Sequence, residues 1–104
     1  MSAAESRSPS VWCFSVFAAP EACVMPRVLE FFAKRGLVPA RFHGDVVDHG
    51  AEGLVIDVQI ADLAAATAEH IAACLRGIVY VERVLTAVKR PAIQLPFAAQ
   101  AVAR

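Results

Sequence analysis

The chain has 104 residues, enough for one domain, and 58% of them are hydrophobic, a fraction raised by its many alanines. Ten basic residues balance ten acidic residues, so there is no net charge to attract nucleic acid or an anionic membrane. Charged residues interrupt every apolar run before the ~20 residues that a membrane span needs. The N-terminal MSAAESRSPS lacks the apolar core of a secretory signal, so we expect a cytoplasmic protein.

Six elements are expected in chain order. Residues 1–10 are polar and predicted to be disordered. Aromatic and β-branched residues predict a strand over 11–18, and a helix is expected over 22–35. Strands are predicted over 38–47 and 54–60, joined by a polar, glycine-bearing loop. A second helix over 63–75, with Asp62 as its N-cap, precedes a strand over 78–88. The domain is thus assigned to residues 11–88, followed by a C-terminal tail over 89–104.

The first helix has the clearest pattern. Its apolar residues recur at helical spacing and form one stripe, whereas its charged residues face away. The stripe consists of Val24, Val28, Phe31 and Phe32. Gly36 follows, where a residue that readily adopts positive φ ends a helix. Lys34 and Arg35 oppose the negative end of the helix dipole.

The hairpin and the second helix also have sided patterns. Alternation places Phe42, Val46, Leu54, Ile56, Val58 and Ile60 on one face of the hairpin, and Arg41, His43, Asp45, Asp57 and Gln59 on the other. The second helix is expected to bury Leu63, Thr67, His70, Ile71, Cys74 and Ile78. In this interpretation His70 lies at the edge of the core and bonds to the backbone.

The order β-α-β-β-α-β predicts the α+β, ferredoxin-like fold: a four-stranded antiparallel sheet with two helices on one face. The other face is left uncovered within the chain. Trp12, Phe17 or Val55 is expected there, according to strand register, and exposed apolar sheet favours association.

No catalytic or metal constellation is expected. Cys13, Cys23 and Cys74 form no Cys-x-x-Cys motif and have no Cys/His spacing typical of structural zinc, so they are interpreted as reduced, mostly buried thiols, with disulfide or metal roles as the alternatives. His43, Asp45 and His49 have loose spacing, and a solvated face or a subunit contact explains them better than a metal site. Ser15 and Cys23 lack the flanking signatures of activated nucleophiles. Gly53–Val58 has neither the rings nor the charge of an RNA-recognition strand.

The segment 22–39, ACVMPRVLEFFAKRGLVP, and the later IVYVERV resemble the ACT domain. They are most similar to the small regulatory subunit of acetohydroxyacid (acetolactate) synthase, where this helix typically reads P-G-V-L-x-R-V-x-x-L-F-x-R-R-G-F-N-I. Cys23 and Val38 occupy the positions of that family's glycine and asparagine. The resemblance spans about residues 11–86.

The resemblance implies a non-catalytic regulatory subunit, without a cofactor, that forms a homodimer and tunes an enzyme of branched-chain amino-acid biosynthesis. That partner would be a thiamine-diphosphate enzyme. The alternative is a free-standing homodimeric sensor of a small molecule. The sensor would bind its ligand, an amino acid in this family, at the dimer interface, whereas the regulatory subunit need bind nothing small. The ligand-binding residues that the resemblance implies are Pro20, Glu21, Ala22, Cys23 and Val24 of one subunit and Val38, Pro39, Ala40 and Arg41 of the other.

Overall fold

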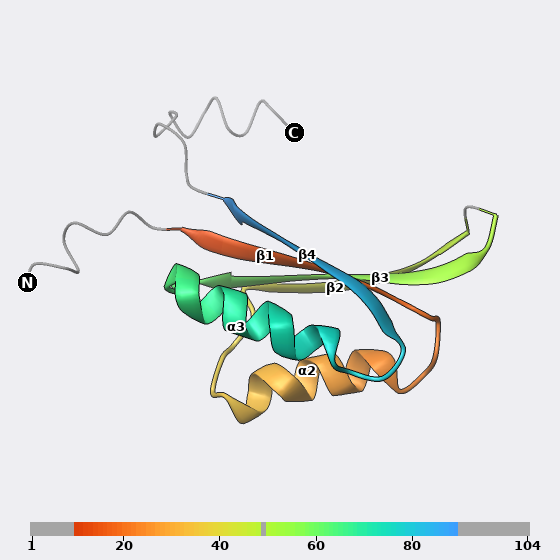
Figure 1. Cartoon of the computed structure of the whole chain (residues 1–104), viewed down its shortest axis with the longest axis horizontal. Coiled ribbons are helices and arrows are strands. Elements are labelled where there is room, and N and C mark those ends of the chain that lie inside the picture. Colours follow the sequence, from red (N-terminus) through yellow and green to blue (C-terminus); the bar gives the residue numbers. More distant parts are fainter. Residues whose placement is uncertain (1–9, 49, 90–104) are drawn as a thin grey trace, which may run out of the picture.

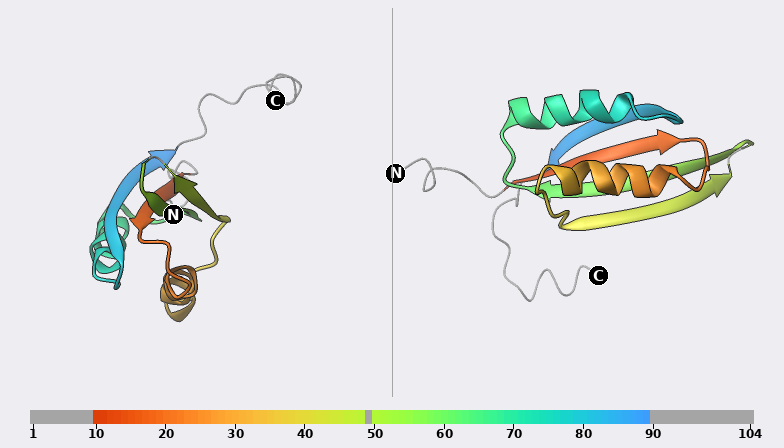
Figure 2. Two further views of the ribbon diagram at one scale, coloured as in Figure 1. Left: turned by 90° about the vertical axis from the view of Figure 1, so that its right-hand side faces the viewer. Right: turned by 90° about the horizontal axis from the view of Figure 1, so that it is seen from below.

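A computed structural model describes residues 10–48 and 50–89. The elements follow the expected order: β1 (Val11–Ala18), α2 (Val24–Lys34), β2 (Arg41–Asp48), β3 (Glu52–Ala61), α3 (Ala65–Arg76) and β4 (Val81–Lys89). Figure 1 labels these elements. The strands form one antiparallel sheet in the order β2-β3-β1-β4, so β2 and β4 are its edges (Figure 2, right). The expected disordered segment and tail lie, apart from Ser10 and Lys89, outside the described residues.

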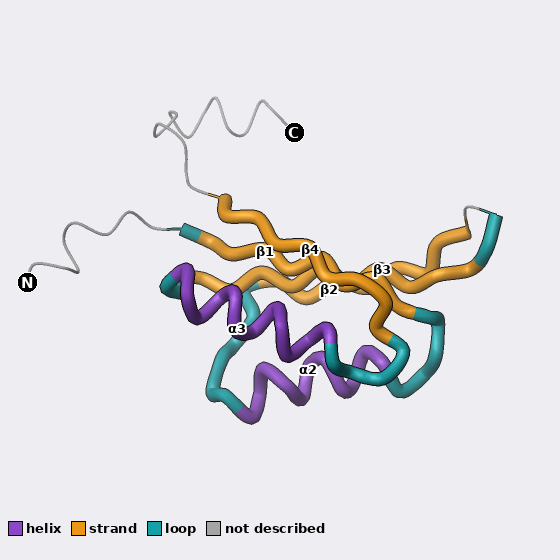
Figure 3. The backbone as a smooth tube through the Cα atoms, in the orientation of Figure 1, coloured by secondary structure: helices purple, strands orange, loops and turns teal. Residues whose placement is uncertain are grey.

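Both helices cover the same face of the sheet, as expected, and Figure 2 shows them side by side against it. The tube in Figure 3 separates the two layers, with the helices below the strands. This arrangement confirms the predicted ferredoxin-like fold. It also leaves the opposite face of the sheet without a covering element among the described residues.

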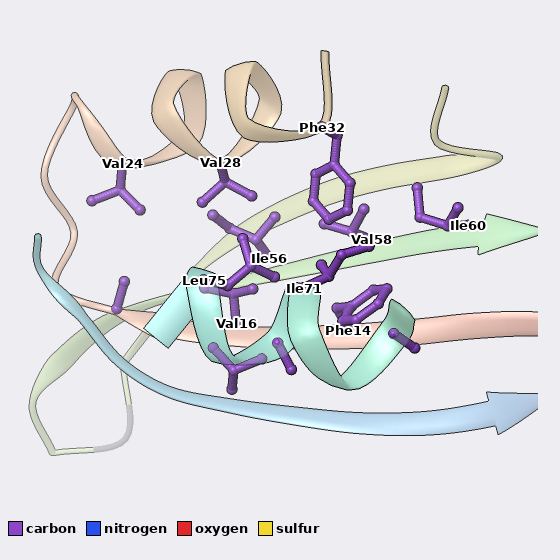
Figure 4. Packing of buried hydrophobic residues seen from close by; sticks show 14 of the residues in the cluster. Phe14, Val16, Val24, Val28, Phe32, Ile56, Val58, Ile60, Ile71 and Leu75 are labelled. Carbon is purple, nitrogen blue, oxygen red and sulfur yellow. The ribbon is translucent and has the colours of Figure 1, made fainter. Parts of the chain in front are cut away.

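The core lies between the two layers. Every second residue of β1 and β3 points into it, and the α2 stripe packs against them (Figure 4). Phe14 and Phe32 make an aromatic pair with their ring centroids 5.9 Å apart. The fully buried large side chains are Phe14, Val16, Val24, Val28, Phe32, Ile56, Val58, Ile60, Ile71, Leu75 and Val84.

The end of α2 follows from Gly36, which has a φ of +70°. Its N–H donates to the Ala33 carbonyl at 3.0 Å, and the Leu37 N–H donates to the Phe32 carbonyl at 3.0 Å. These two bonds are the Schellman arrangement, which satisfies carbonyls that the helix leaves free. Arg35 lies over the Phe31 ring, 3.6 Å from its centroid. The predicted helix stop is therefore confirmed.

The start of α3 differs from the expectation. Asp62 does not cap the helix: it has a φ of 63°, its N–H donates to the Ser10 carbonyl at 3.0 Å, and Ala64 is the N-cap. The buried face of α3 consists of Ala68, Ile71, Ala72 and Leu75, whereas Thr67 and His70 are exposed. The predicted stripe was therefore rotated on the helix, because two of the four buried residues are alanines and give a weak apolar signal.

Two strands begin three residues later than predicted. β2 begins at Arg41, because the segment through Pro39 is an irregular connection and pairing starts with the Ala40 N–H, which donates to the Gln59 carbonyl at 2.7 Å. β4 begins at Val81, because residues 78–80 turn the chain and Tyr80 adopts a φ of 76°.

The strand register decides which large residues lie on the open face. Phe17 pairs with Val55, and both lie on that face. Trp12 instead shares the helix-facing side with Phe14 and Val16, and its indole N–H donates to the Leu63 carbonyl at 3.0 Å. The expectation is thus met by Phe17 and Val55 and not by Trp12.

Candidate functional site

Residues 20–24, expected to bind a ligand, form the connection from β1 into α2. The Val24 N–H donates to the Glu21 carbonyl at 3.1 Å, and the Arg27 N–H donates to the Cys23 carbonyl at 3.2 Å. Cys23 is the N-cap, but no side chain caps this helix and its first turn has no acidic residue. Since Pro26 has no N–H, the Met25 N–H is the one in Val24–Arg27 without a backbone partner, and it is the group that could donate to an anion at this end.

Two hollows lie between this end of α2 and the edge strand β2. One, of about 270 Å³, is lined by Pro20, Glu21, Ala22, Met25, Val46 and Leu54. The other, of about 650 Å³, is wider and mostly apolar, and is lined by Ala22, Met25, Pro26, Leu29, Phe42 and Gly44. Because Ala22 and Met25 line both, the hollows form one continuous strip, which we call the α2–β2 groove.

The predicted site residues differ in their relation to this groove. Pro20, Glu21 and Ala22 line it. Cys23 is half-buried and does not line either hollow, and the Val24 side chain is fully buried in the core. Of residues 20–24, the side chains of the first three are thus the ones placed to contact a molecule in the groove.

Residues 38–41 lie at the opposite end of α2. Val38 is 85% exposed, Pro39 is half-buried, and Ala40 is held by its bond to β3. The Arg41 Nε lies 3.4 Å from the Asp57 carboxylate. With about 16 Å of helix between them, residues 20–24 and 38–41 do not meet within one protomer. That separation is what a site shared between two subunits requires, and the shared site stays a prediction.

Sequence reasoning missed most of the groove. Met25 and Leu29 are 38% and 44% exposed, although they are apolar and adjoin the core stripe. Val46 was expected to face the core, and it is on the helix side of β2, but it is 64% exposed. The reason is that β2 is an edge strand that α2 covers incompletely. The signal in the sequence is the i, i+4 pair of Met25 and Leu29, outside the Val24–Val28–Phe32 stripe.

Met25 and Gly44 fit together across the groove. The Met25 thioether lies against the Gly44 backbone, in the space that a side chain at position 44 would occupy. A glycine within a strand often marks such a close approach. The floor of the groove is therefore formed by the flexible Met25 side chain, which packs on the Gly44 backbone.

The other candidate residues do not assemble into a reactive centre. On the open face, the His43 Nε2 lies 2.9 Å from an Asp45 carboxylate oxygen, and both side chains are exposed. No group of three or more histidines, cysteines and carboxylates is placed to hold a metal among residues 10–48 and 50–89. His49 lies outside the described residues. All three cysteines are free and half-buried.

His70 is not where the sequence placed it. It is exposed, and its Nε2 lies 3.6 Å from the Cys74 Sγ rather than bonding to the backbone. The i, i+4 spacing that brings these two side chains together on the outside of α3 is visible in the sequence, but it was interpreted as part of the buried stripe.

The sheet and the two helices on one of its faces define a small ferredoxin-like domain, with a groove beside the first helix. A family model described as an ACT-like domain matches residues 6–91. The chain therefore belongs to the family of ACT-like domains, which are regulatory and non-catalytic modules.

Solved structures agree on the fold. The C-terminal domain of the MgtC protein from Mycobacterium tuberculosis matches with a TM-score of 0.63 at 13% identity, over 80% of this chain and 90% of that one. The ACT domain of GTP pyrophosphokinase from Chlorobium tepidum matches with a TM-score of 0.62 at 8% identity, over 74% and 96%.

The regulatory subunit of aspartate kinase from Thermus flavus gives a TM-score of 0.60 at 11% identity, over 81% of this chain and 57% of that one. A search of curated proteins finds no match. Within the described residues, no helix is long and apolar enough to cross a membrane.

Proposed function

We propose that the chain is a regulatory module that works as a homodimer joined along α2 and β2, and that it binds a small metabolite where the two subunits meet. The observation that carries the proposal is the α2–β2 groove, an apolar strip beside an edge strand. Among the described residues nothing covers it, and Met25, Leu29 and Val46 are left partly in water. A second copy that pairs along β2 would bury this surface.

The direction of the strands supports the shared site. In a two-fold dimer the two β2 strands would run antiparallel, so the end of one subunit's strand would face the beginning of the other's. The start of α2 lies beside the end of β2, as Val46 and Glu21 line the same hollow. Residues 20–24 of one subunit would then meet residues 38–41 of the second copy.

The chemistry of the groove supports an amino acid as the metabolite. In the first turn of α2 the Met25 N–H is left to donate to a carboxylate, and the Glu21 side chain offers a partner for an ammonium group. Pro20, Ala22, Met25 and Leu54 supply apolar surface for a side chain. The half-buried Cys23 at the N-cap takes the place of the glycine of the family that the chain resembles, and its side chain lines neither hollow.

We further propose that the module tunes a catalytic subunit, and that acetolactate synthase, a thiamine-diphosphate enzyme of branched-chain amino-acid biosynthesis, is the first candidate. This step depends on the resemblance of residues 22–39 to the small subunit of that enzyme. The alternative, a free-standing sensor, depends only on the α2–β2 groove and requires no catalytic partner.

The dimer is tested by sedimentation of the full chain and of two charge variants. Val46→Lys places a charge in the groove and is expected to give a monomer. Leu85→Lys places the same charge at a position of similar exposure on β4, 49% against 64%, and should leave the dimer intact. A Val46→Lys chain that still sediments with the wild-type mass would refute the interface.

Binding is tested by a melting screen against amino acids. A ligand at a hundredfold excess over its Kd stabilises the folded state by about 2.7 kcal/mol. Cys23→Gly tests the resemblance: stronger binding would support the family's use of a glycine here, and unchanged binding is expected if the groove alone holds the ligand, because the Cys23 side chain lines neither hollow. Recovery of the tagged chain with a thiamine-diphosphate enzyme in equal amount supports the regulatory subunit, and recovery as a homodimer alone supports the sensor.

A further inference from the structure

The outer surface of α3 carries a histidine and a cysteine, two residue types that can ligate metals, and the proposed function uses neither of them. His70 is exposed and Cys74 is half-buried, and they are one helical turn apart, away from the buried Ala68, Ile71, Ala72 and Leu75. Residues at i and i+4 of a helix are neighbours on its surface. The His70 Nε2 and the Cys74 Sγ lie 3.6 Å apart.

This distance matches the geometry of a tetrahedral cation. Zinc holds a cysteine sulfur at about 2.3 Å and a histidine nitrogen at about 2.0–2.1 Å. With a tetrahedral angle at the metal, these bond lengths place the sulfur and the nitrogen about 3.5 Å from each other. The 3.6 Å between these two atoms is a thiol–imidazole hydrogen-bond distance, and it is also close to the separation that a shared zinc ion requires.

We propose that His70 and Cys74 together chelate one divalent cation of borderline softness, such as Zn²⁺. A thiolate and an imidazole are the ligands that such cations prefer over Mg²⁺ or Ca²⁺. On binding, the Cys74 thiol releases its proton to solvent, and the His70 Nε2 uses its lone pair while Nδ1 keeps the ring proton. No third ligand of the described residues is near, so water fills the other positions.

The surroundings of the pair are compatible with a cation. The nearest basic side chain along the helix, Arg76, points toward β4, where its guanidinium donates to the Val84 carbonyl at 2.9 Å. Both ligands belong to one helix, well inside its Ala65–Arg76 bounds, so binding needs no reorganisation of the backbone. The chelate also joins two successive turns of α3 and stabilises the folded chain when the cation is present.

The test is a titration of the untagged full chain with Co²⁺, whose thiolate complexes have a charge-transfer absorption that reports a metal–sulfur bond. We expect one equivalent to bind with this absorption. Cys74→Ser is expected to abolish the band, and His70→Ala to weaken binding by about tenfold or more. Zn²⁺ should displace the Co²⁺ and bleach the band.

Two control variants separate a chelate from an isolated reactive thiol. His70→Ala combined with Ala73→His keeps the composition but puts the histidine next to Cys74, where adjacent helical side chains do not face each other. It should bind as weakly as His70→Ala. Cys23→Ser removes a thiol from the far helix and should leave the titration unchanged. All the substituted positions are exposed or half-buried, and circular dichroism verifies folding.

Wild-type binding in the histidine-shifted variant, or a charge-transfer band that survives Cys74→Ser, would overturn the proposal. So would the absence of any Co²⁺ absorption in the wild-type chain. The outcome is independent of the α2–β2 groove, because the monomeric Val46→Lys chain should bind Co²⁺ as the wild type does.

Discussion

Replacing Phe32 by alanine should remove a large part of the stability of the domain. The ring is fully buried, and it contacts Phe14 at a centroid distance of 5.9 Å and Phe31 at 5.3 Å. A buried Phe→Ala change costs about 3–5 kcal/mol, which includes the cavity that it leaves. A domain of this size has a stability of roughly 4–12 kcal/mol, so the variant should be close to unfolding.

The neighbouring Phe31 provides a matched control. It is half-buried at the helix flank, under Arg35, so its removal opens no enclosed cavity. Phe31→Ala should lower the free energy of unfolding by about 1–2 kcal/mol, from lost apolar burial and the cation–π contact.

Urea unfolding can follow both variants through the single tryptophan, Trp12, which is half-buried and bonded to the Leu63 carbonyl. If the two variants have the same m-value, the difference between their urea midpoints measures how much more the enclosed Phe32 ring contributes to the free energy of unfolding than the half-buried Phe31 ring does. Equal losses for the two phenylalanines would refute the assignment of Phe32 to the core and of Phe31 to the flank.

Two single substitutions and one double-mutant cycle test local geometry. Gly36→Ala should lower stability by about 1–2 kcal/mol in thermal unfolding, because its φ of +70° is unfavourable for alanine although the space is open. Asp62→Gly should raise stability by about 0.5–1 kcal/mol, because it relieves the same strain at a φ of 63°; a loss would show that the carboxylate contributes. Gly44→Ala and Met25→Ala should be non-additive by about 0.5 kcal/mol or more in a double-mutant cycle, because the new methyl group displaces the thioether. Additive values would mean that the two residues do not touch.

The sequence was most informative where strong apolar residues repeat at one period. Val24, Val28 and Phe32, followed by Gly36, predicted α2, its buried face and its end. The phase of α3 was wrong because alanines form half of its buried face, and the same helix also exposes Ala65, Ala66 and Ala73, so its alanines do not mark one side.

The candidate site was predictable only in part. Glu21 and Ala22 came from the resemblance of the chain to a family, and both line the groove. The contributions of Met25, Gly44 and Val46 depend on how far α2 reaches over the edge strand. The reach of α2 over β2 is set by the packing of the whole helical layer, so it cannot be predicted from the pattern of any single segment.

The order of strands in the sheet also determines how the chain can fold during synthesis. β1 is made first, but its partners are β3, 36 to 50 residues later in the Ala18–Leu54 and Val11–Ala61 pairs, and β4, later still. The β2–β3 hairpin is the one pairing of adjacent strands, so it can close early, whereas β1 must wait for it. Until β4 is complete, β1 is an exposed edge with free backbone groups, and Phe17 lacks the Arg83 guanidinium that lies over its ring in the folded chain. A chain in which β1, β2 and β3 have paired but β4 has not would therefore be a three-stranded intermediate, open to pairing with another chain along β1.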